Sequence, residues 1–225
     1  MDTYYLSFDC ATKTFAYILL KIDNKKINID LDKIKNLLKI IQKKIEMGNI
    51  TSEVTDTINT LYNNLTSTIN IITGDCVDLL PGKSNNSVNT VQRIQLVSKF
   101  VKSTILPLIE NIPNSRLQVL IEFQMSHNTQ AKVVSIALIS LFSDHNTHLI
   151  NPSLKNSFHI TDSGQYCFFI EKYKNKYDAN KKHALFNFKE FERIFNQKLD
   201  ISDNLKGHIA DAFMQIWGYR MHNKN

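Results

Sequence analysis

The chain has 225 residues, with 27 Lys plus Arg against 21 Asp plus Glu and a formal net charge of +6 at pH 7. This length suffices for one domain with a sizeable core, and no apolar run is long enough for a membrane-spanning helix. The basic excess suits a polyanionic partner such as nucleic acid, although many soluble proteins carry a similar excess. The three cysteines form no CxxC pair, so we expect a reduced, soluble, intracellular protein. The sequence opens with a strand pattern, so we expect no signal peptide.

Two apolar, aromatic-rich runs at the start of the chain predict an antiparallel hairpin. They cover residues 3–9 and 15–22, and residues 10–14 form the turn between them. Residues 23–66 then change in character to Asn, Lys, Ile and Thr, with apolar residues at helical spacing. We expect this stretch to be a helical insertion within a single domain that spans residues 1–225. Its role is open between packing and the binding of a partner or of DNA.

The next part of the chain predicts a third strand and a long amphipathic helix. The strand covers residues 69–80, with an expected interruption at Gly74. The helix covers residues 89–106, with Pro107 as its expected end. The apolar stripe expected on this helix consists of Val91, Ile94, Val97, Val101 and Ile105.

The remainder of the chain alternates between apolar runs and helical patterns. Strands are expected over residues 117–123 and 148–151, and helices over residues 129–142, 180–195 and 204–221, while residues 166–170 could form a further strand. This order of elements predicts an α/β domain in which helices flank a mixed five-stranded sheet.

Three widely spaced carboxylates suggest a metal-dependent nuclease. Asp9 and Glu122 each close an apolar strand, and such strand ends face the edge of the sheet at which open α/β sheets bind ligands. His208 and Asp211 are three residues apart on the last helix and flank its apolar stripe. Hard oxygen ligands with at most one imidazole suit Mg²⁺ or Mn²⁺ rather than zinc. Two such ions would activate an attacking water and stabilise the leaving 3′ oxygen of a phosphodiester.

Each of these residues also has a purely structural interpretation. Asp9 could be a turn former, Glu122 a paired surface residue, and His208 with Asp211 a solvated helix face. The order and spacing of all four together favour the catalytic interpretation.

Three short segments point to a particular family. Residues 7–17 form the opening hairpin, residues 121–124 read Ile-Glu-Phe-Gln, and residues 208–212 read His-Ile-Ala-Asp-Ala. These segments resemble motifs of the RuvC-type Holliday junction resolvases of the RNase H-like superfamily, especially those of poxviruses and related large DNA viruses. Ala11 departs from the pattern, because glycine is usual at that position and has a wider range of dihedral angles. The resemblance covers most of the chain outside about residues 23–66.

The resemblance implies an RNase H-like fold and assigns roles to individual side chains. The metal ligands it implies are Asp9, Glu122, His208 and Asp211, with Asp203 as a fallback for His208. Basic residues fall where the family has lysines near the scissile phosphate, and there a lysine stabilises developing negative charge. The resemblance makes Lys182 a catalytic residue as well as a DNA contact, and it places Lys13, Lys155 and Lys181 at the DNA.

The function that the resemblance implies is the resolution of four-way DNA junctions. The protein would be a homodimeric endonuclease with two Mg²⁺ or Mn²⁺ ions in each active site, making paired symmetric nicks on the two strands. It would act in recombination or in the resolution of viral genome concatemers, at a cytoplasmic replication site if the source is viral. The alternatives are an RNase H-like nuclease acting on RNA/DNA hybrids or general branched DNA, and a non-catalytic junction-binding protein.

Overall fold

The computed structural model describes residues 2–11, 13–23, 68–82, 87–123, 128–156, 169, 171–173, 175–194 and 196–223. The helical insertion predicted for residues 23–66 lies outside the described residues, apart from Asp23 at its start.

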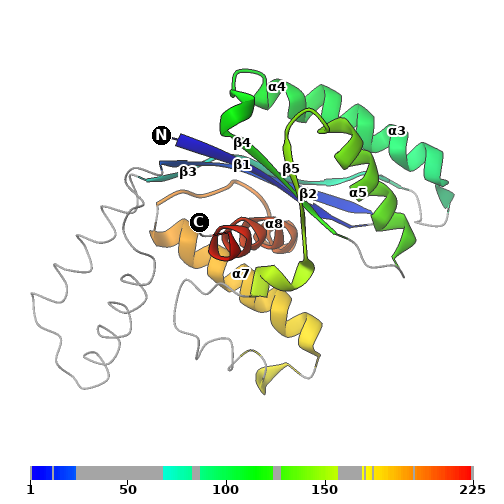
Figure 1. Ribbon diagram of the computed structural model, residues 1–225. Helices are drawn as coiled ribbons and strands as arrows, with labels where there is room; N and C mark the ends of the chain where they lie inside the picture. The colour runs from blue at the N-terminus through cyan, green and yellow to red at the C-terminus, as the bar shows by residue number, and fades with distance from the viewer. Residues whose placement is uncertain are drawn as a thin grey trace, which may run out of the picture.

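One mixed sheet runs through the centre of the molecule (Figure 1). Its strands are β1 (Asp2–Cys10), β2 (Thr14–Asp23), β3 (Ile69–Asp78), β4 (Leu117–Glu122) and β5 (Asn146–Ile150). Their order across the sheet is β3-β2-β1-β4-β5. β2 is antiparallel to both β1 and β3, whereas β4 is parallel to β1 and β5 is parallel to β4. The prediction of a mixed five-stranded sheet flanked by helices is therefore confirmed.

Helices cover both faces of the sheet (Figure 1). One face packs against α7 (Lys176–Ile194) and α8 (Asp203–His222). The other packs against α3 (Thr90–Phe100), η2 (Val101–Ile105), α4 (Leu106–Ile109) and α5 (Thr129–Leu141). The short helical turns η3 (Asn114–Arg116) and η4 (Pro152–Asn156) precede β4 and follow β5. Because both faces are covered, β1, β2 and β4 are apolar along most of their length instead of strictly alternating.

The predicted end of a helix at Pro107 is wrong, because the helical path continues from α3 through η2 into α4. Residues Val101–Ile105 adopt π-helical spacing, and the N–H of Leu106 donates to the carbonyl oxygen of Val101. Pro107 has no N–H to donate, and it occupies the first turn of α4, where a missing donor costs least. The widened turn lets the chain pass the proline without breaking.

Burial also corrects the stripe predicted on that helix. Val97 is fully buried as expected, but 62% of Val91 and 38% of Ile94 are exposed. Arg93 takes a buried place on this face. The long side chain of an arginine can bury its apolar methylene groups. A prediction based only on the positions of apolar residues therefore misses it.

Two strand predictions also change. The interruption in β3 falls at Ile72, between the paired residues Ile71 and Thr73, and not at Gly74. Gly74 is instead a site of close approach, because a Cβ there would lie 3.0 Å from Cδ1 of Leu199. The strand predicted for residues 166–170 is wrong at Phe169, which is helical. No helix in the described ranges has both the length and the apolar character needed to cross a bilayer.

Candidate active site

The register of the two central strands brings the first two carboxylates together. β1 and β4 are parallel and pair Phe8 with Ile121, so Asp9 and Glu122 follow at the same edge of the sheet. Side chains alternate between the faces of a strand, and Phe8 and Ile121 belong to the core beneath α3 and α5. Asp9 and Glu122 therefore project from the opposite face, which α8 covers. Both are buried, at 5% exposure each.

Helix α8 supplies the third carboxylate and the imidazole. Asp211 is 2% exposed, and His208 lies one turn before it on the same side of the helix. The Nδ1 atom of His208 donates to Oδ2 of Asp9 over 3.0 Å, and its Nε2 atom lies 3.3 Å from Oγ1 of Thr14 on β2. Thus α8 connects the ends of β1 and β2, although His208 and Asp9 are 199 positions apart.

Two lysine ammonium groups complete the cluster. Nζ of Lys155, in η4, lies 3.1 Å from Oε1 of Glu122 and 3.6 Å from Oδ2 of Asp211. Nζ of Lys181, on α7, donates to Oδ2 of Asp211 and lies 3.9 Å from Oδ2 of Asp9. Each lysine therefore pairs with two carboxylates. We refer to Asp9, Glu122, Asp211, His208, Lys155 and Lys181 as the carboxylate cluster.

The two strand-end carboxyl groups have opposite electrostatic environments. Burial alone would raise the pKa of Asp9, but the hydrogen bond from His208 and the charges of Lys181 and Lys155 hold it below its ordinary value. Burial raises the pKa of Glu122 to about 8, and the negative charge of Asp9 adds to this effect despite the opposing charge of Lys155. Burial and the negative charge of Asp9 thus favour the protonated form of the Glu122 carboxyl group, whereas the hydrogen bond from His208 favours the ionised form of Asp9.

The lysines remain charged in this environment. Burial lowers the pKa of Lys155 and of Lys181, but the surrounding carboxylates outweigh that effect and raise both above the ordinary lysine value. Burial likewise raises the pKa of Asp211, against the attraction of Lys155. The balance between three buried acidic groups and two ammonium groups therefore determines the charge of the cluster.

The side chains of the cluster are of the chemical types that bind a divalent cation. Three carboxyl groups and one imidazole supply mostly hard oxygen atoms, which Mg²⁺ and Mn²⁺ prefer. Burial and the negative charge of Asp9 raise the pKa of Glu122, so a cation bound nearby would favour the ionised form of this carboxyl group. Among the described residues, however, no three His, Cys, Asp or Glu side chains stand in a coordinating arrangement. The ammonium groups of Lys155 and Lys181 occupy the space between the carboxylates instead.

Neither of the other two predicted lysines is a member of the carboxylate cluster. Lys182 neighbours Lys181 but is exposed, because successive helix residues point about 100° apart. Lys13 is about half exposed and forms an ion pair with Asp78 over 3.4 Å. Asp203 is the first residue of α8, which has Ser202 as its N-cap. Lys155 and Lys181, which the resemblance placed at the DNA near the scissile phosphate, are the lysines that meet the carboxylates.

The sequence did not predict several residues that support the cluster. Gly218 on α8 allows η4 to pass closely, because a Cβ there would lie 2.3 Å from the carbonyl oxygen of Leu154, next to Lys155. Ser135 on α5 donates to the carbonyl oxygen of Glu122 over 3.0 Å. Ser7 on β1 donates to Gln215 on α8 over 3.1 Å, inside the core. Of these contacts, only the one at Gly218 could have been inferred from the sequence, because a glycine inside a helical pattern can indicate close packing.

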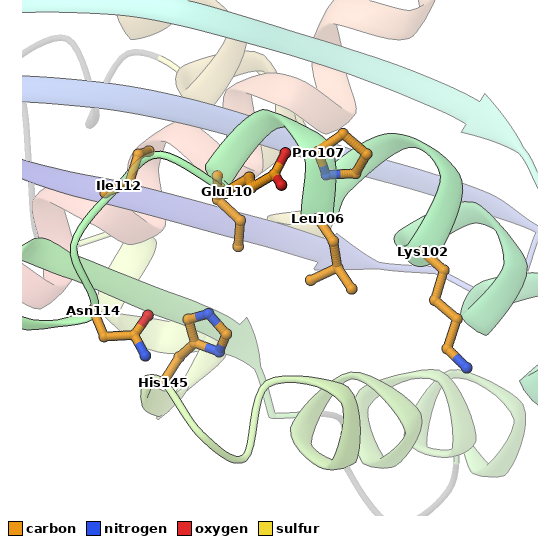
Figure 2. A pocket seen from close by; sticks show the side chains of 8 residues that line it. Lys102, Leu106, Pro107, Glu110, Ile112, Asn114 and His145 are labelled. Carbon is orange, nitrogen blue, oxygen red and sulfur yellow. The ribbon is translucent and has the colours of Figure 1, made fainter.

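A pocket of about 410 Å³ lies away from the carboxylate cluster (Figure 2). It is lined by α4 and by Asn114 and His145, which precede β4 and β5. Since β4 and β5 are parallel and Glu122 is the last residue of β4, this pocket lies at the opposite ends of these strands. It contributes nothing to the cluster.

Comparisons with known proteins give matches among solved structures. No protein-family model matches the sequence, and no curated protein matches it. The structure is similar to Fowlpox virus resolvase in a complex with substrate Holliday junction DNA, with 16% identity and a TM-score of 0.48 over 99% of this chain and 100% of that chain. It is also similar to T. thermophilus RuvC in complex with Holliday junction substrate, with 7% identity and a TM-score of 0.47 over 99% and 97% of the two chains. A further Thermus thermophilus RuvC structure has 6% identity and a TM-score of 0.45 over 100% and 98%.

Proposed function

We propose that this protein is a metal-dependent endonuclease that resolves four-way DNA junctions. The observation that carries the proposal is the carboxylate cluster itself. Asp9, Glu122 and Asp211 are each at most 5% exposed, come from three separate elements and meet at one edge of the sheet beside two lysines. Buried acids at such a density are costly for a fold, which argues for a catalytic rather than a structural role.

The residues of the cluster have distinct roles in this proposal. Asp9, Glu122, Asp211 and His208 would hold two Mg²⁺ or Mn²⁺ ions. Bound metal of this kind activates water and neutralises charge on a phosphodiester. Both ring nitrogens of His208 have partners, Asp9 over 3.0 Å and Thr14 over 3.3 Å, so one of these contacts would give way when the ring binds a metal. Lys155 and Lys181 would move to the phosphate and stabilise the negative charge that develops there.

The junction as substrate follows from the resemblance of the three sequence segments. A two-fold symmetric junction calls for two symmetric cuts, which a homodimer with two active sites would provide. Contacts of lysines with phosphates would supply most of the affinity, and the shape of the junction would supply the specificity. The rival substrates are RNA/DNA hybrids and general branched DNA. The intact carboxylate set argues against a protein that only binds junctions.

The decisive experiment compares end-labelled four-way junctions, RNA/DNA hybrids and plain duplex DNA in the presence of Mg²⁺ or Mn²⁺. We expect paired symmetric nicks on the junction and little cutting of the duplex. Asp9→Asn and Asp211→Asn should each lower the cleavage rate by at least about 10³-fold, because they remove charged ligands from the metal site. Junction binding by both variants should persist in a mobility-shift assay.

Two results would contradict the proposal in different ways. Hybrids cut as fast as junctions would replace junction resolution with an RNase H-like activity at the same site. Full activity of both Asp variants would show that the carboxylate cluster is not the active site at all. Purification without metal, followed by titration of Mg²⁺ while the melting temperature is recorded, tests metal binding separately from cleavage.

A further inference from the structure

Tyr177 is an exposed aromatic side chain that borders the carboxylate cluster. It lies in the first turn of α7, and 64% of its surface is exposed, the largest value among the large hydrophobic side chains that the structure describes as exposed. Nζ of Lys181, one turn further along the helix, lies 5.8 Å from the centre of the Tyr177 ring. The same Nζ atom is 3.9 Å from Oδ2 of Asp9. The ring and the carboxylates therefore contact the same ammonium group.

Packing among the residues that the structure describes does not account for this ring. Three nearby aromatic residues, Phe169, Tyr173 and Phe186, contact one another through Phe169. Tyr177 makes no ring contact with another aromatic residue within the described ranges. Its backbone N–H donates to Oδ1 of Asn175 over 2.9 Å, but this contact begins the helix without any use of the ring.

The surroundings of Tyr177 suit a nucleic acid base. Lys176 and Lys182 are exposed on the same end of α7, with Asp178 as the nearest acidic residue along the helix. An aromatic face among lysines is the combination with which proteins hold single-stranded nucleic acid, since lysines meet the phosphates and the ring stacks on a base. An exposed ring is also open to water, so stacking on a base would remove apolar surface from solvent.

We infer that Tyr177 stacks on an unpaired base next to the phosphate that is cut. The inference rests on the proposed nuclease function and adds to it a contact with a nucleobase whose pairing is broken at or near the junction centre. Tyr177 is then a substrate-binding residue that helps to place the strand against the carboxylate cluster. Stacking is tolerant of base identity, so the contact reads the loss of pairing rather than the sequence.

The test is a double-mutant cycle between the ring and the base. Cleavage by the wild-type protein first locates the scissile phosphate. Binding is then measured with the Asp9→Asn protein, with and without Tyr177→Ala, on junctions that each lack one base near that phosphate. On the intact junction, Tyr177→Ala should weaken binding by about 5- to 100-fold, the range of one base–aromatic stack. On the junction that lacks the base stacked on Tyr177, the same substitution should not weaken binding further.

Matched variants separate stacking from other roles. Tyr177→Phe keeps the aromatic face and should bind like the parent protein. Val91→Ala removes a similarly exposed side chain from α3, on the other face of the sheet, and should also be without effect. The melting temperature of each variant shows whether it is folded.

The outcomes separate this inference from the proposed function. If the wild-type protein cuts junctions but Tyr177→Ala weakens binding equally on every abasic junction, or not at all, the ring only supports Lys181 and the inference is overturned. If the protein binds junctions without cutting, the proposed activity fails, and the same cycle around the crossover still decides the role of Tyr177. If it binds no DNA, both are overturned.

Discussion

The acidic residues of the carboxylate cluster differ in the direction of their pKa shifts although all three are buried. Asp9 is ionised because His208 donates a hydrogen bond to it, whereas Glu122 has a pKa of about 8. A group whose pKa is raised by folding contributes stability below its unfolded pKa, and this contribution is lost as the pH rises through the folded value. For Glu122 the window lies between its ordinary value of 4.5 and about 8. The lowered pKa of Asp9 acts in the opposite sense, below pH 4, so the two effects are separable.

The first prediction at the residue scale concerns Glu122→Gln in the metal-free protein. Glutamine keeps the size of the side chain and cannot ionise, so the loss of stability between pH 5 and pH 8 should become smaller. At pH 8.5 the variant should exceed the wild type in free energy of unfolding by about 1–3 kcal/mol, although its cleavage should be lost. Urea denaturation at a series of pH values provides the measurement. A variant that is less stable than the wild type at pH 8.5 would show that Glu122 is ionised and well paired.

The second prediction compares two neighbouring lysines. Lys181 meets Asp211 and Asp9, whereas Lys182 is exposed. Lys181→Ala should lower the maximal cleavage rate about 10²-fold, in line with the loss of one preorganised electrostatic contact. Lys182→Ala should change the rate less than about fivefold and mainly weaken binding, with a smaller dependence on salt. Single-turnover kinetics at saturating protein distinguish the two effects, and equal losses of rate would refute the assignment.

At the scale of elements, the cluster depends on how closely η4 passes α8. Gly218 makes this approach possible, and Leu154 is the residue before Lys155. The 3.1 Å contact between Lys155 and Glu122 is therefore set by a glycine on another element. Backbone atoms are the nearest neighbours of the missing Cβ, so the protein has no flexible side chain to move aside.

Gly218→Ala is accordingly expected to destabilise the protein by about 1–3 kcal/mol, the usual cost of overpacking a tight contact. Cleavage should fall more than stability alone explains, because Lys155 shifts with η4. Gly207→Ala is the matched control on the same helix, since no atom lies within 4 Å of its added Cβ. That variant should gain about 0.5–1 kcal/mol from better helix propensity. Thermal unfolding of both variants measures the contrast, and equal melting temperatures would contradict the close approach of η4.

At the scale of the whole molecule, β2 and β3 are joined across a narrow gap. The N–H of Asp23 donates to the carbonyl oxygen of Thr68 over 2.8 Å, so the two strand ends form an antiparallel pair. This geometry equals that of a hairpin closed by a two-residue turn. We propose that residues 24–67 are an insertion on which the folding of the rest of the domain does not depend.

Replacement of residues 24–67 by an Asn-Gly turn tests that proposal. The free energy of unfolding should change by less than about 1 kcal/mol beyond the small gain from a shorter loop. Metal-dependent cleavage should be retained, whereas junction affinity would report any contribution of the insertion to DNA binding. A variant that does not fold would show that the segment is part of the core.

The sequence by itself determined the elements and the positions of the main carboxylates. Apolar runs and helical spacing are local patterns, so β1, β2, β4, α5 and α8 were predicted close to their observed bounds. Asp9 and Glu122 were identified because each closes an apolar strand, and Asp211 because it flanks the stripe of the last helix. These sequence patterns predict the structure correctly because each depends on residues only a few positions apart.

Only the tertiary structure decided which side chains meet. Lys181 rather than Lys182 reaches the carboxylates because of the rotation of α7 against the sheet, which a single sequence does not specify. The passage of η4 at Gly218, the exposure of Tyr177 and the raised pKa of Glu122 likewise depend on packing between elements far apart in the chain. The burial and the pKa of a side chain depend on residues that are close in space but distant in the sequence. The local sequence around each residue does not specify which residues these are.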